Sequence, residues 1–300
     1  CIVVRAAKET TRVTASTASN TGHRTIILGA GFAGIQAARA LGNSDVSVTL
    51  VDRKNHHLFQ PLLYQVATAS LAPADIAAPI RHIVAPYRNT EVYLGSAEAI
   101  DLEHKRVHLP DRSLPYDSLI VATGVRHAYF GNTKWEKHAP GLKTVEDAFR
   151  IRERFLMAFE RAEHEDDPSV QQSILTFIIV GGGPTGVELA GAMAEIARHS
   201  MVHDFRRIDP STARVILVEG NDRVLKQYDK KLCDRAKKDL ESLGVEVKLN
   251  TRVTDIDDRC VWVGEDQIPS QNVFWAAGVQ AEAISDTLGV ETDRSGRVPV

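Results

Sequence analysis

The chain has 300 residues, with 36 Lys and Arg against 39 Asp and Glu, which gives a net charge of -3. This length predicts two domains of roughly 150 residues each, and the balanced composition excludes a disordered, collagen-like or disulfide-stapled protein. A near-neutral charge argues against nucleic acid as a partner. No apolar run reaches the roughly 18 residues of a membrane-spanning helix. Cys1, Cys233 and Cys260 form no CxxC pair, so neither a redox dithiol nor a metal site is expected.

Both ends of the chain differ in pattern from the middle. Residues 1–21 hold seven Ser or Thr and a single acid, Glu9, and we expect them to form a flexible tail or linker. At the other end, Gly296 to Val300 has the pattern of a strand that the chain enters and does not leave. Residues 281–300 are therefore predicted to return to the first domain and to be an incomplete part of it.

The first half of the chain opens with a strand, a glycine-rich turn, a helix and a second strand. The strand begins at Thr25, the helix runs from Phe32 to about Gly42, and the second strand ends at Asp52. In such a unit the three glycines of the turn serve the tight bend, the approach of a diphosphate and close helix packing, in that order. Asp52 stands at the position where a carboxylate binds ribose hydroxyls in such units. The alternative is that the glycines only form a turn before the helix and that Asp52 is an ordinary surface residue. The three glycines are Gly29, Gly31 and Gly34.

The same order of elements recurs from Ile174. A second glycine-rich turn precedes a helix from Thr185 to about His199, and Glu219 ends the next strand. An acid at that strand end repels a ribose phosphate, which favours NADH over NADPH. Arg223 lies four residues further and is either a solvated loop charge or a partner for such a phosphate. The glycines of this turn are Gly181, Gly183 and Gly186, and an extended stretch separates them from Glu219.

Between and after these two units the pattern predicts further elements. Residues 91–124 alternate like strands around the turn residues Pro110, Asp111 and Pro115 and indicate a small β-meander. Thr144 and Asp147 form a capping box ahead of a helix, and residues 165–172 are a polar connection. Another helix runs from about Asp229 to Leu243 and ends at Gly244. The predicted fold class is therefore α/β, with two Rossmann-like dinucleotide-binding domains at 22–143 and 144–280 and a β-meander insertion.

Two dinucleotide sites in one chain indicate a flavin that faces a nicotinamide cofactor and receives hydride from it. The protein then has to hold the reacting atoms about 3 to 3.5 Å apart and shield them from water. Thr123 with Gly124, and Ala277 with Gly278, follow two strands of the chain. The glycines there would let the backbone approach a flat cofactor, or they simply end the strands in turns.

Residues 55–74 form a stretch of 20 residues without a charged side chain. It contains Gln60, Pro61 and Tyr64, and it would either line a dry pocket for a ring or fill ordinary core. His56 and His57 are adjacent, so they do not share a face as metal ligands would. Glu188 follows the second glycine turn. It is either a charge placed near the positive end of a helix or a group that faces the nicotinamide and accepts or relays a proton.

Taken together, five segments resemble type II NADH:quinone oxidoreductase, a flavoenzyme of respiratory chains that does not pump protons. The resemblance implies FAD on the first unit and NADH on the second, with Gln60, Pro61 and Tyr64 near the flavin ring and Glu188 near the nicotinamide. It implies a quinone acceptor, a homodimer, and a peripheral position on the cytoplasmic face of a bacterial inner membrane or on an organellar inner membrane. The segments are GAGFAGIQAARAL, the run from Val51 to Arg81, YDSLIVATG, GGGPTGVELAGAMAEI and VFWAAGV.

The chain stops before three parts that the resembled family has. These are a Gly-Asp motif for the flavin ribityl chain, a segment of the quinone site and an amphipathic membrane anchor. We therefore expect these 300 residues to retain FAD poorly. Two other functions stay open: an NADH-dependent reductase of a soluble redox protein such as ferredoxin or rubredoxin, and an NADH- and FAD-binding redox sensor without useful turnover. A disulfide reductase and a sulfide:quinone reductase are disfavoured because the cysteines that they use have no counterparts here.

Overall fold

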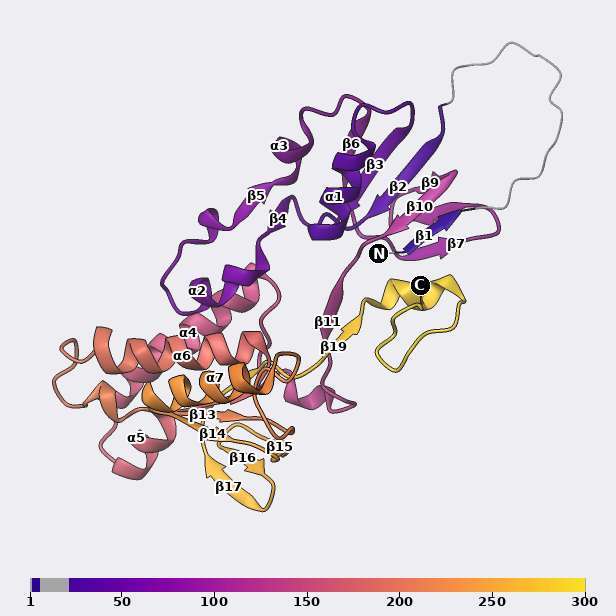
Figure 1. Cartoon of the computed structure of the whole chain (residues 1–300). Helices are drawn as coiled ribbons and strands as arrows, with labels where there is room; N and C mark the ends of the chain where they lie inside the picture. Colours follow the sequence, from indigo (N-terminus) through magenta and orange to yellow (C-terminus); the bar gives the residue numbers. More distant parts are fainter. Residues whose placement is uncertain (1, 6–21, 300) are drawn as a thin grey trace, which may run out of the picture. The chain divides into compact units, whose positions relative to one another are not determined.

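The structure is a computed structural model that describes residues 2–5 and 22–299 and contains two compact units (Figure 1). The first unit comprises Cys1–Leu58, Ala77–Arg126 and Val279–Val300, and the second comprises Phe59–Ile76 and His127–Gly278. These borders differ from the predicted domain borders, because residues 59–76 and 127–143 pack within the second unit. That the two parts are FAD- and NADH-binding domains stays a prediction.

The first unit is built on a five-stranded sheet in the order β1-β10-β2-β3-β6. Four of its strands are parallel, and β1 runs antiparallel to β10 at one edge. Two helices and a three-stranded meander complete the unit. The strands of the sheet are β1 (Ile2–Arg5), β2 (Arg24–Leu28), β3 (Ser47–Asp52), β6 (Thr90–Leu94) and β10 (Ser118–Val121); the helices are α1 (Phe32–Leu41) and α3 (Ile80–Val84); the meander is β7 (Ala99–Asp101), β8 (Arg106–His108) and β9 (Ser113–Pro115).

Alternation along β2 shows how this sheet is packed on both faces. Ile27 belongs to a buried cluster with Ile35 of α1 and Ile80 of α3. Its neighbour Ile26 belongs to a second cluster, which includes Val107 of the meander. Because successive side chains of a strand point to opposite faces, the sheet separates a helical layer from a meander layer.

Three predictions for the first unit need correction. The predicted meander is confirmed at residues 99–115, but residues 90–94 and 118–121 are strands of the main parallel sheet. Pro115 ends β9 and is not a turn residue. The tail predicted at residues 1–21 is wrong for Ile2–Arg5, which form β1; the rest of that prediction lies outside the described residues. A segment so rich in Ser and Thr has no alternating pattern that would predict a further strand at the edge of the sheet.

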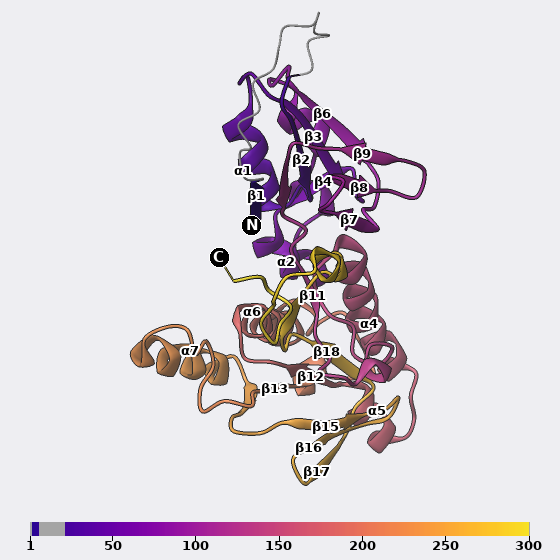
Figure 2. The same cartoon turned by 90° about the vertical axis from the view of Figure 1, so that its right-hand side faces the viewer.

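The second unit has a four-stranded parallel sheet in the order β14-β13-β12-β18. It has its own meander, which Figure 2 shows as three strands side by side. The sheet consists of β12 (Thr176–Val180), β13 (Arg214–Val218), β14 (Val245–Lys248) and β18 (Asn272–Trp275); the helices are α2 (Leu63–Ala67), α4 (Val145–Glu163), α5 (Pro168–Ile174), α6 (Pro184–Glu195) and α7 (Lys230–Ser242); the meander is β15 (Val253–Ile256), β16 (Cys260–Val263) and β17 (Asp266–Pro269).

The same alternation divides the core of the second unit. Phe177 of β12 stacks among aromatic rings of α4, with its centroid 5.1 Å from Phe155 and 5.6 Å from Phe159. Ile178 instead joins the cluster that contains Trp275 and the buried residues of the meander. Both units therefore bury a parallel sheet between helices and a meander, which confirms the predicted α/β class and its two Rossmann-like sheets.

The remaining elements are short. Two pairs of strands are hydrogen-bonded outside the main sheets, β4 (His56–Leu58) with β5 (Ala77–Pro79) and β11 (Val125–His127) with β19 (Val279–Ala281). A π-helical turn, η4 (Ile196–Ser200), continues α6. The 3-10 turns are η1 (Gln60–Leu62), η2 (Pro73–Asp75), η3 (Thr133–Trp135), η5 (Pro210–Thr212) and η6 (Ala283–Leu288).

The helix ends in the second unit agree only in part with the ends that the sequence predicts. The capping box at Thr144 and Asp147 is confirmed, with the Asp147 N–H 3.1 Å from the Thr144 hydroxyl. The predicted helix at 229–243 is confirmed as α7. The polar connection predicted at 165–172 is wrong in its second half, because α5 begins at Pro168. There the Asp167 carboxylate caps the helix by accepting from the Ser169 N–H at 2.8 Å.

Two further stretches differ from their predicted conformations. The stretch predicted as extended, residues 199–212, is not extended, because turns and bends follow the end of η4 and lead into η5. Residues 296–299 form no strand. Instead a turn forms in which Gly296 has a φ of +73° and the Asp293 carboxylate accepts from the Arg297 N–H at 3.0 Å.

Candidate functional site

The glycine-rich turn of the first unit joins β2 to α1. Gly29 has a φ of +96°, and a Cβ atom there would lie 2.4 Å from the Ala122 carbonyl oxygen. A Cβ on Gly34 would lie 1.7 Å from the Gly29 oxygen. The chain itself therefore requires the first and third glycines.

Gly31 differs from these two glycines. Its φ of -69° suits any residue, and a Cβ atom built there meets nothing within 4 Å. The turn thus leaves room at the start of α1, which has no side-chain cap and no acidic residue in its first turn. A helix N-terminus of this kind attracts an anion, so the geometry fits a diphosphate and explains the glycine.

The carboxylate of Asp52, at the end of β3, is hydrogen-bonded to this turn. Its Oδ2 accepts from the Ala30 N–H at 2.6 Å, and its Oδ1 accepts from the Lys54 N–H at 2.7 Å. His57 supports the same place, because its Nδ1 lies 2.8 Å from the Ala30 carbonyl oxygen. Each carboxylate oxygen can accept a second hydrogen bond, so a ribose hydroxyl can still bind Asp52.

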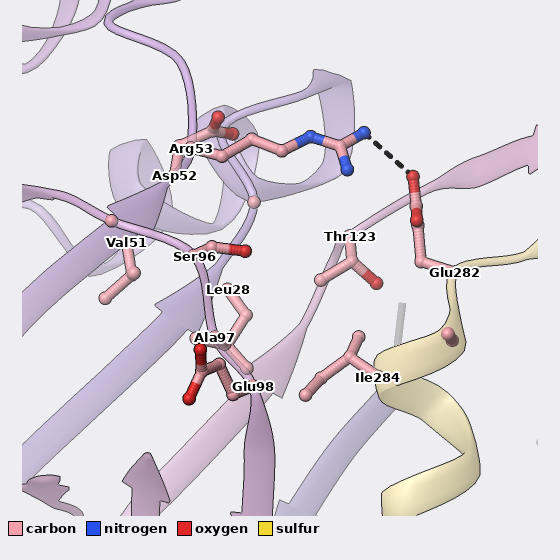
Figure 3. A pocket seen from close by; sticks show the side chains of 13 residues that line it. Leu28, Val51, Asp52, Arg53, Ser96, Ala97, Glu98, Thr123, Glu282 and Ile284 are labelled. Carbon is pink, nitrogen blue, oxygen red and sulfur yellow. Dashed lines mark hydrogen bonds and ion pairs between the residues drawn. The ribbon is translucent and has the colours of Figure 1, made fainter. Parts of the chain in front are cut away.

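A cavity of about 310 Å³ lies beside Asp52 in the first unit (Figure 3). Its wall is completed by the segment at the start of η6, where the Arg53 guanidinium contacts the Glu282 carboxylate at 2.9 Å. Among the predicted residues Gly29, Asp52 and Thr123 line the cavity, whereas Gly31, Gly34 and Gly124 do not. The sequence did not single out the other lining residues, which are Leu28, Val51, Arg53, Gly95, Ser96, Ala97, Glu98, Glu282, Ala283 and Ile284.

The second glycine-rich turn joins β12 to α6 and repeats the geometry of the first. Gly181 has a φ of +112°, and its Cβ would lie 2.7 Å from the backbone of Ala276. A Cβ on Gly186 would lie 1.8 Å from the Gly181 oxygen. Gly183 has an ordinary φ of -76° with nothing within 4 Å of a built Cβ. Room for an anion is again left where the helix begins.

Glu219 directly follows β13, and its carboxylate is hydrogen-bonded to this turn as that of Asp52 is to the other. Its Oε2 accepts from the Gly182 N–H at 2.6 Å, and its Oε1 accepts from the Asn221 N–H at 2.8 Å. The loop that follows covers the turn, because the Leu225 N–H donates to the Gly182 oxygen at 2.7 Å. Arg223 in this loop lies 3.9 Å from the Asp222 carboxylate. The strand end thus carries an acid whose position is fixed by backbone hydrogen bonds.

The two strand-ending glycines have the same backbone conformation and different surroundings. Gly124 has a φ of +78° and Gly278 a φ of +77°, so the turn that each makes requires a glycine. A Cβ on Gly124 meets nothing within 4 Å, whereas a Cβ on Gly278 would lie 2.4 Å from Cζ of Phe130. Binding of a cofactor by Thr123, Gly124, Ala277 and Gly278 stays a prediction.

The uncharged stretch at 55–74 is partly core and partly surface. Leu63, in α2, is buried within the second unit, where α2 packs against α4 and α6. Gln60 and Pro61 are exposed, and the Gln60 amide donates to the Lys143 carbonyl oxygen at 3.3 Å. The Tyr64 hydroxyl accepts from the Gln65 amide at 3.0 Å. That Gln60, Pro61 and Tyr64 lie near a flavin stays a prediction.

Glu188 is the fifth residue of α6 and lies just past the first turn, which contains no acid. The prediction that Glu188 stands in the first turn is therefore wrong. The Glu188 side chain is exposed, and partial desolvation by its surroundings raises the pKa of its carboxyl group. A raised pKa suits a group that exchanges a proton. That Glu188 faces the nicotinamide stays a prediction.

Within residues 2–5 and 22–299, no group of three or more His, Cys, Asp or Glu side chains could hold a metal ion. Over the same part of the chain, no helix has both the length and the apolar character needed to cross a membrane.

Comparison with known proteins adds to this geometry. The family model described as pyridine nucleotide-disulphide oxidoreductase matches residues 23–300. The type II NADH:quinone oxidoreductase Ndh of Mycobacterium tuberculosis is 44% identical over 93% of this chain, and NdhA of the same organism is also 44% identical over 93%. This chain spans 63% and 62% of the length of these two relatives.

A solved structure supports the fold. NDH2 from Plasmodium falciparum, solved in complex with NADH, superposes with a TM-score of 0.83 at 23% identity. The match covers 89% of this chain and 57% of that chain. At this identity the likeness concerns the arrangement of the backbone.

Proposed function

Because the chain belongs to the pyridine nucleotide-disulphide oxidoreductase family, we propose that it is a type II NADH:quinone oxidoreductase. In this proposal NADH is the electron donor, FAD is the resident cofactor and a membrane quinone is the acceptor, without proton pumping. The observation that carries the proposal is the repeated site. Each unit has a glycine-rich turn with room at its second glycine and a strand-ending acid bonded to that turn.

FAD fits the first unit. Gly31 leaves space for its diphosphate at the start of α1, and Asp52 stands beside a cavity that can take an adenosine. Thr123 lies on the opposite side of the turn from Asp52, because β2 lies between β3 and β10 in the sheet. When bound, the flavin supplies the group that takes hydride from NADH and passes two electrons to the quinone.

NADH fits the second unit. Gly183 leaves space for the diphosphate, and the Glu219 carboxylate can accept from ribose hydroxyls. The same negative charge would repel the additional phosphate of NADPH. Glu188 would accept or relay a proton near the nicotinamide, and activity in E188Q should then lose the acidic limb of its pH profile. An unchanged profile would remove Glu188 from the mechanism.

Quinone as the acceptor is supported by the relatives at 44% identity. Since quinones of this kind reside in the bilayer, we infer a peripheral position on a respiratory membrane, at the cytoplasmic face of a bacterial inner membrane. Flotation of the full-length form of the protein with lipid vesicles tests this position. The proposal includes a homodimer, which sedimentation would test.

The experiment that tests the function compares acceptors and a Glu219 variant. NADH oxidation should be fast with a short-chain quinone and slow with ferredoxin or rubredoxin. Faster reduction of the iron–sulfur protein would assign the chain to the reductases of soluble redox proteins, and slow turnover with every acceptor would indicate a sensor. In E219Q the KM for NADH should rise about tenfold while the KM for NADPH falls, because a charged hydrogen bond and a repulsion are both lost. Equal KM values in E219Q and the wild type would remove Glu219 from the NADH site.

A further inference from the structure

A tight turn in the second unit presents an exposed aromatic ring. The Asn132 N–H donates to the Tyr129 carbonyl oxygen at 2.9 Å, and the two residues between them, Phe130 and Gly131, have φ values of +51° and +87°. This sign pattern is that of a type I′ turn, in which Asn, Asp or Gly is favoured at both positions. Phe130 therefore holds a strained backbone conformation that its side chain does not favour.

The strained backbone of Phe130 does not bring its ring into the core. The residue is 69% exposed, and it lies above a buried aromatic layer that includes Trp275, with the two ring centroids 6.2 Å apart. Its tip contacts Gly278, where a Cβ atom would lie 2.4 Å from Cζ. These contacts leave most of the residue exposed, and a strained backbone of this kind often marks a functional position.

The order of the strands places this ring relative to the proposed NADH site. In the sheet, β12 lies between β13 and β18. Glu219 directly follows β13, and the glycine-rich turn follows β12. Gly278 lies three residues beyond Trp275, the last residue of β18. A dinucleotide with its adenosine at Glu219 and its diphosphate at Gly183 must direct its other nucleoside toward β18. Gly181 packs against the backbone of Ala276 and Ala277, so the path from the turn to Gly278 is short.

We propose that Phe130 is a binding residue that contacts the nicotinamide riboside of NADH. The inference rests on the proposed function and names a residue that the glycine and acid pattern does not include. The exposed faces of the ring offer an apolar surface to a flat nicotinamide, and contacts of this kind stabilise aromatic pairs. The first unit lacks this feature at the corresponding place, where a Cβ on Gly124 would meet nothing within 4 Å.

The test uses calorimetric titration of the purified protein with NAD+ and with ADP-ribose, which lacks the nicotinamide. Asn tolerates the backbone of Phe130, so F130N keeps the turn and removes the ring, while F130Y keeps both. F130N should weaken NAD+ binding about 5- to 10-fold and change ADP-ribose binding less than twofold. F130Y should bind both ligands like the wild type. F149A, which removes a ring that is 47% exposed on α4, is the matched control and should change neither.

Three outcomes separate this inference from the proposed function. Equal NAD+ affinity in F130N and the wild type overturns the inference and leaves the NADH site intact. Equal loss of NAD+ and ADP-ribose affinity in F130N assigns Phe130 to the stability of the turn, which also overturns it. Failure of the wild type to bind either ligand contradicts the NADH site itself and the inference with it.

Discussion

In both units a carboxylate at a strand end is hydrogen-bonded to the glycine-rich turn. The two units differ in the residues that surround these strand ends. In each, one carboxylate oxygen accepts from the turn at 2.6 Å and the other accepts from the N–H two residues further along the chain. In the first unit a cavity wall comes from a segment some 230 residues after Asp52, at Glu282 to Ile284. In the second unit an aromatic turn covers the strand-ending Gly278.

This difference shows which part of a dinucleotide site is local. The turn and its acid depend on backbone geometry over one βαβ unit, so they take the same form twice. The residues that would select between a flavin and a nicotinamide come from other segments, because they must meet the ends of the ligand and not its diphosphate. On the proposed function, two similar turns would hold different ligands because the segments around them differ.

The largest effect on this comparison is expected when the third glycine of each turn is replaced by alanine. In G34A and G186A the new Cβ would meet a carbonyl oxygen at less than 2 Å, and backbone cannot move away cheaply. The free energy of unfolding should fall by about 3 kcal/mol or more in both variants, as measured by urea denaturation. A loss confined to one variant would show that the two turns are not equivalent.

Filling the second glycine should separate binding from stability. G31A and G183A place the Cβ in open space at an ordinary φ, so the free energy of unfolding should change by less than about 0.5 kcal/mol. The Kd for added FAD should rise about tenfold in G31A, and the KM for NADH should rise about tenfold in G183A, because the new methyl group displaces a diphosphate. The assignment of the two ligands would be contradicted if G31A affected NADH and G183A affected FAD.

The smallest expected effect compares one carboxylate of each unit. Hydrogen bonds from Arg24 hold the pKa of Asp117 at about 2 in the first unit, and hydrogen bonds from Lys134 and Trp135 hold the pKa of Asp255 at about 2 in the second. Each pKa is lower in the folded state, so the stabilisation is full above pH 4 and is lost as the pH falls toward 2.

D117N and D255N should each lower the free energy of unfolding by about 0.5 to 1 kcal/mol at pH 6, because these pairs are solvent-exposed. The difference from the wild type should shrink as the pH falls from 4 to 2, which denaturation at several pH values would follow. A difference that is constant over this range would show that the lost stability is not electrostatic.

The sequence correctly predicts those parts of the site whose conformation depends on residues close together in the chain. Gly29 and Gly181 were placed in tight turns because a buried strand precedes each and a helix follows, and both have positive φ in the structure. Asp52 and Glu219 were found by their position at strand ends. The capping box at Thr144 was found in the same way, since its two partners are three residues apart.

The missed residues depend on contacts between distant segments. Arg53 meets Glu282 across 229 residues of sequence, and no local pattern reports such a meeting. His57 was set aside as a metal ligand, and its bond to Ala30 follows only from the fold. Phe130 lacks the Asn-Gly signal that a type I′ turn usually carries. The helix α5 did have a signal, since Asp167 and Pro168 form a cap, but its polar composition resembled a loop.

The central claim is that this chain passes electrons from NADH through FAD to a quinone. The most direct measurement uses the chain in its full-length form, reconstituted with FAD, and follows flavin absorbance under anaerobic conditions, first on adding NADH and then on adding a short-chain quinone. We expect bleaching by NADH and prompt recovery of the oxidised spectrum with the quinone. Absence of bleaching would contradict the NADH and FAD sites, and bleaching without recovery would contradict the quinone.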